Sequence, residues 1–344
     1  MISIEKQLDE IDITAHEKRD YSTLKKRYTW YIDDIKRKLM RTHSKIPVTR
    51  GTIKGFELLS FKEVKDSYGI NNTMFFNSEL PGGFIFAAKE FFELKNDNWV
   101  FCSLYPRKVI GQTTAAERFF GPEGKKRFLI DTYNLIGSNS SNWLGGSRVD
   151  GPCSYYLDCD MTKSSSIISV ARLVRKKFPN GVGVYTADGG IGYDEKDRKR
   201  SKEQINSILL AGEVICGIMS VGYRGTMIVK IFSGLHEWTH QLIAFISLFF
   251  TKVTVRKIFT SNPLNRELYV IASDRNKTIP KFTTKIIDHI LDESGVGTFG
   301  FSGEQILKIS ENMDKFALRQ ISHYGKINTP PKFNTERYFE HIGE

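Results

Sequence analysis

The stretch Thr226-Met227-Ile228-Val229-Lys230-Ile231-Phe232 has the character of a buried β-strand with one charged residue inside it. An ammonium group in such an apolar run is costly unless a partner or a reaction holds it there. Two other strand-like stretches carry a carboxylate at one end: Asp188 follows residues 183–187, and Glu267 begins residues 267–272. We therefore expect Lys230 to lie between these two acids in a functional site.

The surrounding pattern predicts an α/β fold. Strands alternate with helices between residues 47 and 275, which indicates parallel βαβ units and a Rossmann-like, doubly wound, mostly parallel sheet. The expected strands are 73–77, 98–104, 182–188, 226–232, 252–259 and 267–273. If the strand from Glu267 runs antiparallel to its neighbour, its first residue falls on the carboxyl edge where Asp188 and Lys230 also lie. One crevice can then hold all three side chains.

Helical additions are expected at both ends of this core. Residues 1–46 form a basic helical arm, and 276–344 form a helical extension with a capping box at 302–305. The arm has an apolar stripe: Leu24, Tyr28, Tyr31, Ile35 and Leu39. We interpret this arm as a helix docked by its stripe rather than as a dedicated nucleic-acid arm. Residues 106–151, rich in Gly, Ser and Asn, are read as an insert in the 47–275 domain.

Charge and cysteine usage narrow the class of protein. The 344 residues include 50 lysines and arginines against 39 acids, a net charge of +11 that suits a polyanion such as RNA, DNA or an acidic membrane. Solubility alone is the plainer explanation. The four cysteines form no C-x-x-C pair, which favours reduced thiols in an intracellular protein without structural zinc. The start lacks the apolar core of a signal peptide, and the longest apolar run, 242–250, is too short to cross a bilayer.

A glycine turn follows the first predicted strand. Pro81-Gly82-Gly83-Phe84 lies between the apolar residues 74–76 and a helix-like segment, 86–94. Such a turn at the carboxyl end of a strand lets a nucleotide-like ligand approach the backbone closely. The turn is neither G-x-G-x-x-G nor a P-loop, so a dinucleotide or ATP is poorly supported.

Four motifs occur in order: Pro81-Gly82-Gly83-Phe84, Ala187-Asp188-Gly189-Gly190, residues 225–230, and residues 261–269. This series resembles the FtsJ-like family of S-adenosylmethionine-dependent RNA ribose 2′-O-methyltransferases, which have the class I methyltransferase fold. Residues 203–206 and Glu213 make the chain most similar to the branch that methylates the first transcribed nucleotide of capped mRNA. The resemblance covers residues 48–274, and the lysine-, isoleucine- and phenylalanine-rich composition suits a large DNA virus.

The resemblance implies a Lys-Asp-Lys-Glu tetrad on Lys54, Asp188, Lys230 and Glu267, with Lys62 and Lys65 as competitors for the first position. A ribose hydroxyl must lose its proton as it attacks the methyl group, so the site needs a base within hydrogen-bond reach. Lys230 is the expected base. Asp188 and Glu267 would orient its amine, and Lys54 would stabilise the developing alkoxide.

The resemblance also implies S-adenosylmethionine as cofactor. The family pattern assigns it to Asp188 and to the turn residues Ser78, Glu79, Pro81, Gly82, Gly83 and Phe84. Asp160 would meet the adenine amine, although it could instead cap the helix that follows. The chain departs from the pattern at Phe76-Asn77, where relatives often begin with an aspartate, and after Leu104, where a strand-end acid is missing.

RNA, above all capped mRNA, is the implied partner, together with other subunits of a capping apparatus, whereas DNA and membranes are not expected. The candidates for phosphate contact are Arg50, Lys108, Arg148, Arg198 and Arg200, with Trp143 or Tyr193 for stacking. The implied location is the cytoplasm, a viral factory or virion, or the nucleus.

Two alternatives stay open. His236-Glu237-Trp238-Thr239-His240 matches H-E-x-x-H, the zinc site of metalloproteases, but no glycine and third histidine follow as in metzincins. We therefore expect no metal there. The other alternative is a non-catalytic RNA-binding subunit that retains a methyltransferase fold, which the four ionisable tetrad residues argue against.

Overall fold

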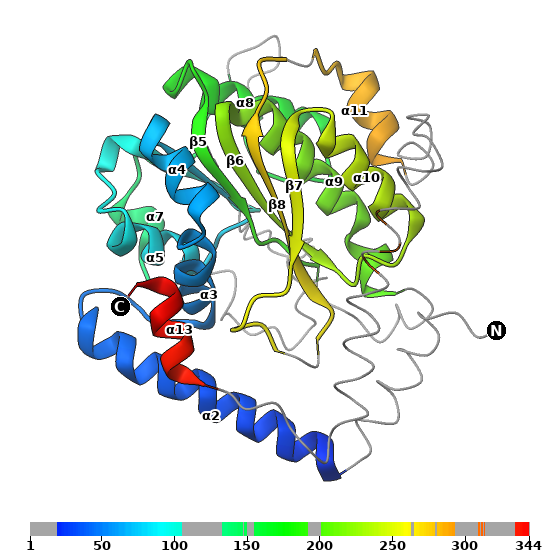
Figure 1. Cartoon of the computed structure of the whole chain (residues 1–344). Coiled ribbons are helices and arrows are strands. Elements are labelled where there is room, and N and C mark those ends of the chain that lie inside the picture. The colour runs from blue at the N-terminus through cyan, green and yellow to red at the C-terminus, as the bar shows by residue number, and fades with distance from the viewer. Residues whose placement is uncertain are drawn as a thin grey trace, which may run out of the picture.

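Strand β6 (Val221–Phe232), which contains Lys230, lies inside a six-stranded sheet (Figure 1). The order of the strands is β2 (Trp99–Phe101), β1 (Met74–Asn77), β5 (Val182–Ala187), β6, β8 (Glu267–Arg275) and β7 (Phe250–Arg256). The first four strands run parallel, and β8 is antiparallel to both of its neighbours. The predicted Rossmann-like, doubly wound and mostly parallel sheet is confirmed.

The computed structural model describes most of the chain. It covers residues 19–104, 133–146, 148–149, 155–191, 201–262, 265–278, 281–292, 309, 311, 313 and 334–343. For residues 19–24, 148–149 and 155–156 it describes the backbone alone. Much of the predicted insert and the predicted capping box at 302–305 lie outside the described residues.

Helices cover both faces of the sheet (Figure 1). One face carries α8 (Ser164–Lys177), α9 (Lys202–Ser220) and α10 (Glu237–Ser247), with α11 (Thr284–Leu291) packed against α8 and α9. The other face carries α3 (Arg50–Leu59), α4 (Lys62–Asn71) and α5 (Gly83–Phe91). Smaller elements are η1 (Asn96–Asn98), α7 (Leu135–Ser138) and the antiparallel pair β3 (Arg148–Val149) and β4 (Tyr155–Tyr156).

The two-residue period of β6 decides which face each of its side chains enters. Val229 and Ile231 join the apolar core under α8, α9 and α10, whereas Ile228 joins the core under α3 and α5. Lys230 lies two residues after Ile228 and so belongs to the α3 face. Because Lys230 pairs with Tyr269 in β8, Tyr269 and Glu267 share this face. Strand register alone therefore places Lys230 and Glu267 on the side that α3 covers.

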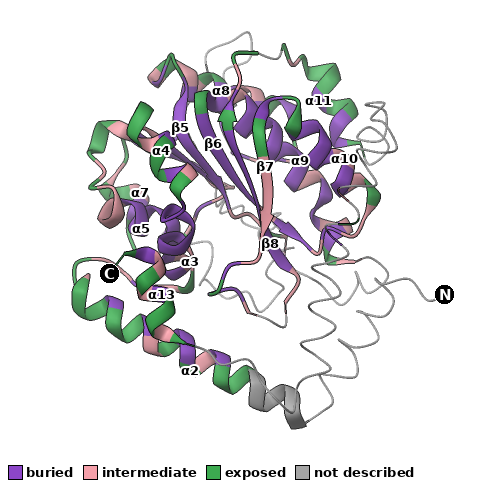
Figure 2. Ribbon diagram, in the orientation of Figure 1, coloured by how far each residue is buried: buried purple, intermediate pink, exposed green. Residues whose placement is uncertain are grey.

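The N-terminal helix α2 (Arg19–Thr42) docks on the core by one face, as predicted (Figure 2). Its buried residues are Tyr28, Tyr31, Ile32, Ile35 and Leu39. The Tyr28 hydroxyl donates to the carbonyl of Thr260 at 2.7 Å. The last described helix, α13 (Thr335–Ile342), contacts both α2 and α3, and Tyr338 donates to the carbonyl of Ile53. The division into arm, domain and extension stays a prediction.

Helix starts follow the capping signals. Ser201 and Gln204 form a capping box at the start of α9, and Thr49 and Thr52 form another at the start of α3. Each box satisfies backbone N–H groups that a helix leaves unpaired at its first turn. The second box fixes the start of the helix that carries Lys54. Among the described helices, none combines the length and the apolar character that a membrane span requires.

Candidate active site

Three adjacent strands and one covering helix bring the four predicted tetrad residues together. Asp188 directly follows β5, whose last residue, Ala187, pairs with Val229 of β6. Glu267 begins β8 opposite Phe232, because the two strands run antiparallel. Lys54 reaches the same edge from the second turn of α3. The predicted convergence of Asp188, Lys230 and Glu267 on one edge is thus what the sheet produces.

Lys54 and Glu267 form a close ion pair. The Lys54 Nζ lies 2.5 Å from Glu267 Oε1, and the Ser261 hydroxyl donates to the same oxygen at 3.0 Å. Burial opposes both charges, but mutual attraction prevails: the pKa of Lys54 is raised, and that of Glu267 is lowered to about 2 by Lys54 and Lys230. The pair is therefore ionised at neutral pH. The competitors Lys62 and Lys65 are exposed on α4, and Lys62 pairs with Asp66.

Lys230 makes a looser contact with Asp188. Its Nζ donates to the Asp188 carbonyl at 2.7 Å and lies 3.4 Å from the carboxylate Oδ1. The Tyr269 hydroxyl donates to that same Oδ1 at 3.0 Å. Only 11% of the Lys230 side chain is exposed, and its amine lies 5.4 Å from the centre of the Phe232 ring. The amine is therefore shielded from bulk water and held next to an acid.

Sequence reasoning missed Tyr269 and Lys257 as parts of this site. Tyr269 could have been found, because it lies two residues after Glu267 and so on the same face of β8. Lys257 Nζ donates to the carbonyl and side-chain oxygens of Asn265, both at 2.7 Å, and to the carbonyl of Glu267 at 3.0 Å. Burial lowers the pKa of Lys257 to about 7, although Glu267 opposes this shift. No local pattern marks such a contact in advance.

The glycines of the predicted cofactor turn serve packing between helices. A Cβ on Gly83 would lie 2.7 Å from the backbone of Gly51, and one on Gly82 would lie 2.6 Å from Leu135. Gly82 also has a φ of 103°, which favours glycine. Neighbouring segments therefore fill the space into which a Cβ would project, and the role of these glycines toward a cofactor stays a prediction. The close approach of α3 to α5 requires Gly83.

Buried acids lie behind the ends of β1 and β5. Glu79 Oε1 accepts a hydrogen bond from the N–H of Phe84 at 2.7 Å. Glu213, from the middle of α9, lies so close to Gly189 that a Cβ there would be 2.1 Å from Glu213 Oε1. Burial raises the pKa of Glu79 well above its ordinary value and that of Glu213 to about 7. The Asp-Gly-Gly motif thus needs Gly189 because Glu213 occupies the adjacent space.

Asn77 stands where the family pattern has an aspartate, and the structure gives it a core role. Its amide donates to the Tyr185 hydroxyl at 2.7 Å, and its oxygen accepts from the Cys102 thiol at 3.1 Å. Tyr185 in turn donates to the carbonyl of Glu213. The described cysteines, Cys102, Cys159 and Cys216, are buried free thiols, as predicted.

The H-E-x-x-H residues are used for local structure. His236 is the N-cap residue of α10 and its Nε2 lies 2.8 Å from the Ser201 hydroxyl, while the Nε2 of His240 lies 2.8 Å from the carbonyl of Gly234. His236 thus precedes the helix on which a zinc motif would place both histidines. Among the described residues, no group of three or more His, Cys, Asp or Glu could hold a metal ion.

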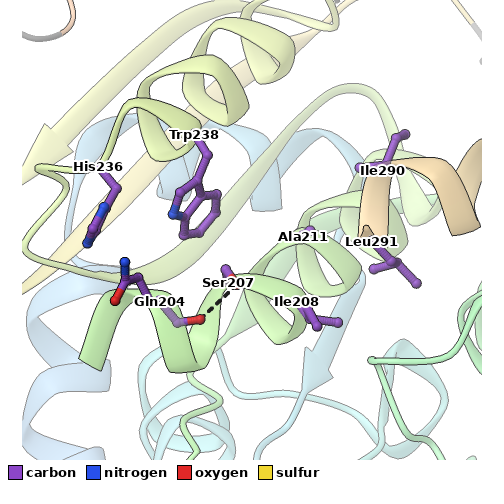
Figure 3. Close-up of a pocket in the computed structure, with 8 residues that line it drawn as sticks. All are labelled: Gln204, Ser207, Ile208, Ala211, His236, Trp238, Ile290 and Leu291. Atoms are coloured by element: carbon purple, nitrogen blue, oxygen red, sulfur yellow. Dashed lines mark hydrogen bonds between the residues drawn. The ribbon is translucent and has the colours of Figure 1, made fainter. Parts of the chain in front are cut away.

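His236 also lines a cavity of about 150 Å³ at one end of α9 (Figure 3). The other lining residues are Gln204, Ser207, Ile208, Ala211, Trp238, Ile290 and Leu291. None of the four tetrad residues lines this cavity.

Three known proteins are similar to parts of this chain. The probable methyltransferase EP424R of African swine fever virus is 32% identical over 248 residues, which are 70% of this chain and 52% of that protein. This chain is related to methyltransferases. Cap-specific mRNA (nucleoside-2′-O-)-methyltransferase 1 of Dictyostelium discoideum is 31% identical over 98 residues, 27% of this chain and 12% of that one. Cap-specific mRNA (nucleoside-2′-O-)-methyltransferase 2 of Danio rerio is 24% identical over 200 residues, 57% and 24% of the two chains.

These relatives confirm the predicted resemblance to FtsJ-like 2′-O-methyltransferases, and the first of them supports the viral connection. The chain spans about half the length of the viral methyltransferase it matches. No family model matches the chain.

Asp160, predicted to meet the adenine of a methyltransferase cofactor, is held by its own neighbours. Its Oδ1 accepts from the N–H of Thr162 at 3.0 Å and from the Thr162 hydroxyl at 2.6 Å, and its Oδ2 lies 3.1 Å from Lys163 Nζ. The alternative that Asp160 caps α8 is wrong, because Lys163 is the N-cap residue and makes no side-chain cap bond. A role toward adenine stays a prediction.

Of the residues of this chain that are predicted to contact RNA phosphates, Arg50 alone has a described side chain. It is exposed at the start of α3, one turn before Lys54, with its guanidinium 6.0 Å from the centre of the Tyr28 ring. Trp143, a stacking candidate, packs against Phe101 at 5.0 Å between ring centres. Arg148 begins β3, and its side chain lies outside the described residues, as do Lys108, Tyr193, Arg198 and Arg200.

Proposed function

We propose that this chain transfers a methyl group from S-adenosylmethionine to a ribose 2′-hydroxyl of RNA, at the cap-adjacent nucleotide of mRNA. The observation that carries the proposal is the shielded amine of Lys230, held by Asp188 beside the ionised Lys54–Glu267 pair. The cap-specific names of two relatives support the choice of substrate. The basic balance of the chain suits a polyanion.

The difference between the two lysines assigns their roles. Lys54 donates to a carboxylate, which stabilises the ammonium form and keeps a positive charge in place. Lys230 donates chiefly to the backbone carbonyl of Asp188, a neutral acceptor that can bind an amine in either protonation state. Lys230 is therefore the group that takes the proton of the ribose hydroxyl, and the Lys54 charge stabilises the oxygen as it becomes an alkoxide.

Tyr269 and Glu267 position these lysines. The Tyr269 hydroxyl fixes the Asp188 carboxylate beside Lys230, and Ser261 fixes the carboxylate of Glu267 that binds Lys54. In each of these two contacts, the side chains come from different segments of the chain. Such support holds reacting groups in the narrow range of geometry that proton transfer requires.

The chain's residues fit S-adenosylmethionine, which when bound supplies a methyl group on a positively charged sulfur. Glu79 Oε2 and Glu213 Oε1 are buried and have no hydrogen-bond partner in the described part of the chain. Acidic oxygens in this state suit a ligand that brings positive charge and N–H donors. Ser78, Glu79 and the backbone of residues 81–84 would hold the cofactor at the end of β1.

Replacing Lys230 with Ala tests the proposal. We expect methyl transfer from labelled cofactor to capped RNA to fall about 100-fold to 10,000-fold, the range that a positioned base contributes. Lys252→Ala, an exposed lysine on β7, is the matched control and should keep full activity. Retained activity in Lys230→Ala would contradict the assignment of the base.

A nuclease digest of the product RNA tests the substrate. We expect the methylated nucleotide to lie next to the cap, and uncapped transcripts to remain unmethylated. A methylated internal nucleotide would move the assignment to another RNA class. RNA binding without any methyl incorporation would support the non-catalytic alternative.

A further inference from the structure

Two buried carboxylates that lie near the ends of β1 and β5 have unsatisfied oxygens. Glu79 is 5% exposed and Glu213 is 1% exposed. Glu79 Oε2 and Glu213 Oε1 have no hydrogen-bond partner among the described residues. A buried oxygen without a hydrogen-bond partner lowers the stability of the folded state. Two such oxygens close together therefore need an explanation, which a bound ligand or a shared proton would give.

Other buried acids of this chain show that the fold can satisfy a carboxylate fully. Both oxygens of Glu57 accept hydrogen bonds from residues 259–260, and both oxygens of Glu203 accept hydrogen bonds from residues 233–239. The unsatisfied oxygens of Glu79 and Glu213 are therefore a local property of this one edge.

The sheet changes winding direction between β1 and β5, and the two acids lie close to the residues that follow these strands. Glu79 belongs to the turn after β1. Glu213 reaches the backbone of Gly189, next to Asp188, and a Cβ on Gly189 would also lie 3.0 Å from Ser78. A Cβ on the next residue, Gly190, would lie 3.4 Å from Lys230 Nζ. The acids therefore border both the cofactor turn and the proposed base.

Three carboxyl groups, those of Glu79, Glu213 and Asp188, interact at this edge. Burial raises the pKa values of both Glu79 and Glu213, and the charge of Asp188 raises them further. Glu213 also raises the pKa of Glu79, whereas Lys230 lowers the pKa values of both acids. Lys54 is already neutralised by Glu267. A ligand that brings a positive charge would relieve the repulsion among these acids.

We propose that Glu79 and Glu213 form a charge-sensing pair that favours the cationic cofactor S-adenosylmethionine over its uncharged-sulfur product, S-adenosylhomocysteine. The inference rests on the proposed function. In the transfer, the methyl carbon leaves sulfur for the ribose oxygen, the sulfur keeps the bonding electron pair, and the hydroxyl proton passes to Lys230. The ligand thereby loses one positive charge beside the two acids, which weakens its binding and promotes product release.

The pair also makes cofactor binding depend on pH. Because burial raises the pKa of Glu213 to about 7, a cationic ligand must displace a proton at lower pH, and its affinity should rise through pH 7. Several titratable groups interact electrostatically with Glu213: Glu79, Asp188, Lys230, Tyr185, Cys102 and Cys216. The neutral-sulfur product should show a weaker dependence.

Titration calorimetry of the full chain with three ligands tests the inference. The ligands are S-adenosylmethionine, S-adenosylhomocysteine and sinefungin, which carries an ammonium group in place of the sulfonium and has no methyl group to transfer. We expect Glu213→Gln and Glu79→Gln each to shift the ratio of cofactor to product affinity about tenfold toward the product at pH 8. Sinefungin should follow the cofactor, because charge and not the methyl group is sensed.

Glu57→Gln is the matched control, because it neutralises a buried acid outside the cofactor region and should leave the ratio unchanged. An equal loss of affinity for all three ligands in Glu213→Gln, or no change in the ratio, would overturn the inference. Failure of the wild-type chain to bind any of the three would overturn it as well. Selective binding without methylation of RNA would instead count against the proposed function alone.

Discussion

Two pairs of buried carboxylates in this chain differ in how many of their oxygens accept hydrogen bonds. Glu57 on α3 accepts hydrogen bonds from the N–H groups of Phe259 and Thr260 and from the Thr260 hydroxyl. Glu203 on α9 accepts from residues 233, 235, 236 and 239. Glu79 and Glu213 are as deeply buried but keep unpartnered oxygens. Burial of an acid is therefore no sign of function by itself, and the unpartnered oxygens are what distinguish Glu79 and Glu213 from Glu57 and Glu203.

The satisfied pair shapes the loops that present the tetrad. Glu203 holds the loop that leaves β6 after Phe232, and Glu57 holds the loop that leads from β7 toward Glu267. Each carboxylate pairs with backbone N–H groups that a buried loop would otherwise leave unsatisfied. The fold uses these acids as fixed acceptors, whereas Glu79 and Glu213 each keep one unpartnered oxygen.

Among the variants that test this difference, Glu203→Ala is expected to change the free energy of unfolding the most. Removing the carboxylate leaves several buried donors without an acceptor, so the free energy of unfolding should fall by about 3 kcal/mol or more. Urea denaturation measures the loss. Glu203→Gln keeps one acceptor oxygen and should lose less. A loss below about 1 kcal/mol for the alanine variant would show that water replaces the carboxylate easily.

A pH-dependent effect of similar size is expected from Glu213. Its pKa is about 7 in the folded chain against 4.5 when unfolded, so the folded state binds more protons between these values. Stability of the ligand-free chain should therefore fall as the pH rises from 4.5 to 7, by roughly 3 kcal/mol at most. Glu213→Gln should remove this slope in urea titrations between pH 5 and 7. An unchanged slope would mean that Glu213 is hydrated in solution.

Glu267 contributes with the opposite sign and in another window. Its pKa is lowered to about 2, so its contribution to stability is present above pH 4.5 and is lost as the pH falls toward 2. The two acids can therefore be separated by pH alone.

The smallest effect is expected from Glu79→Gln in the ligand-free chain. Because the wild-type carboxylate is buried with one unsatisfied oxygen, replacing it with a neutral amide of similar shape should leave the free energy of unfolding unchanged within about 1 kcal/mol, or raise it. Glu57→Gln should be clearly destabilising under the same conditions. Equal losses in Glu79→Gln and Glu57→Gln would erase the distinction between the two pairs.

The local sequence predicts much of the fold and the strands that carry Lys230 and Glu267. The apolar runs around Lys230 and Glu267 have the two-residue period and flanking turns of strands, and these features depend on neighbours in the chain. The capping box at Ser201 is equally local. Boundaries are less accurate: the sequence predicts a strand at 252–259, and β7 lies at Phe250–Arg256.

Short patterns leave the surroundings of their residues open. Residues of the glycine turn and of the H-E-x-x-H stretch contact segments that lie far away in the chain. His236 meets Ser201, and Gly83 meets Gly51. Short motifs do not say which distant segment occupies the space around them, and that occupant decides whether the motif binds a ligand or a neighbour.

The sequence by itself determined which residues are strands, which face of β6 carries Lys230, and which ionisable groups are available, because periodicity and residue type are local properties. Only the tertiary structure decided that Lys54 meets Glu267, that Tyr269 meets Asp188, and that Glu213 lies against Gly189. Those contacts join residues far apart in the chain. They depend on how helices and strands pack, and packing is fixed by the whole core at once.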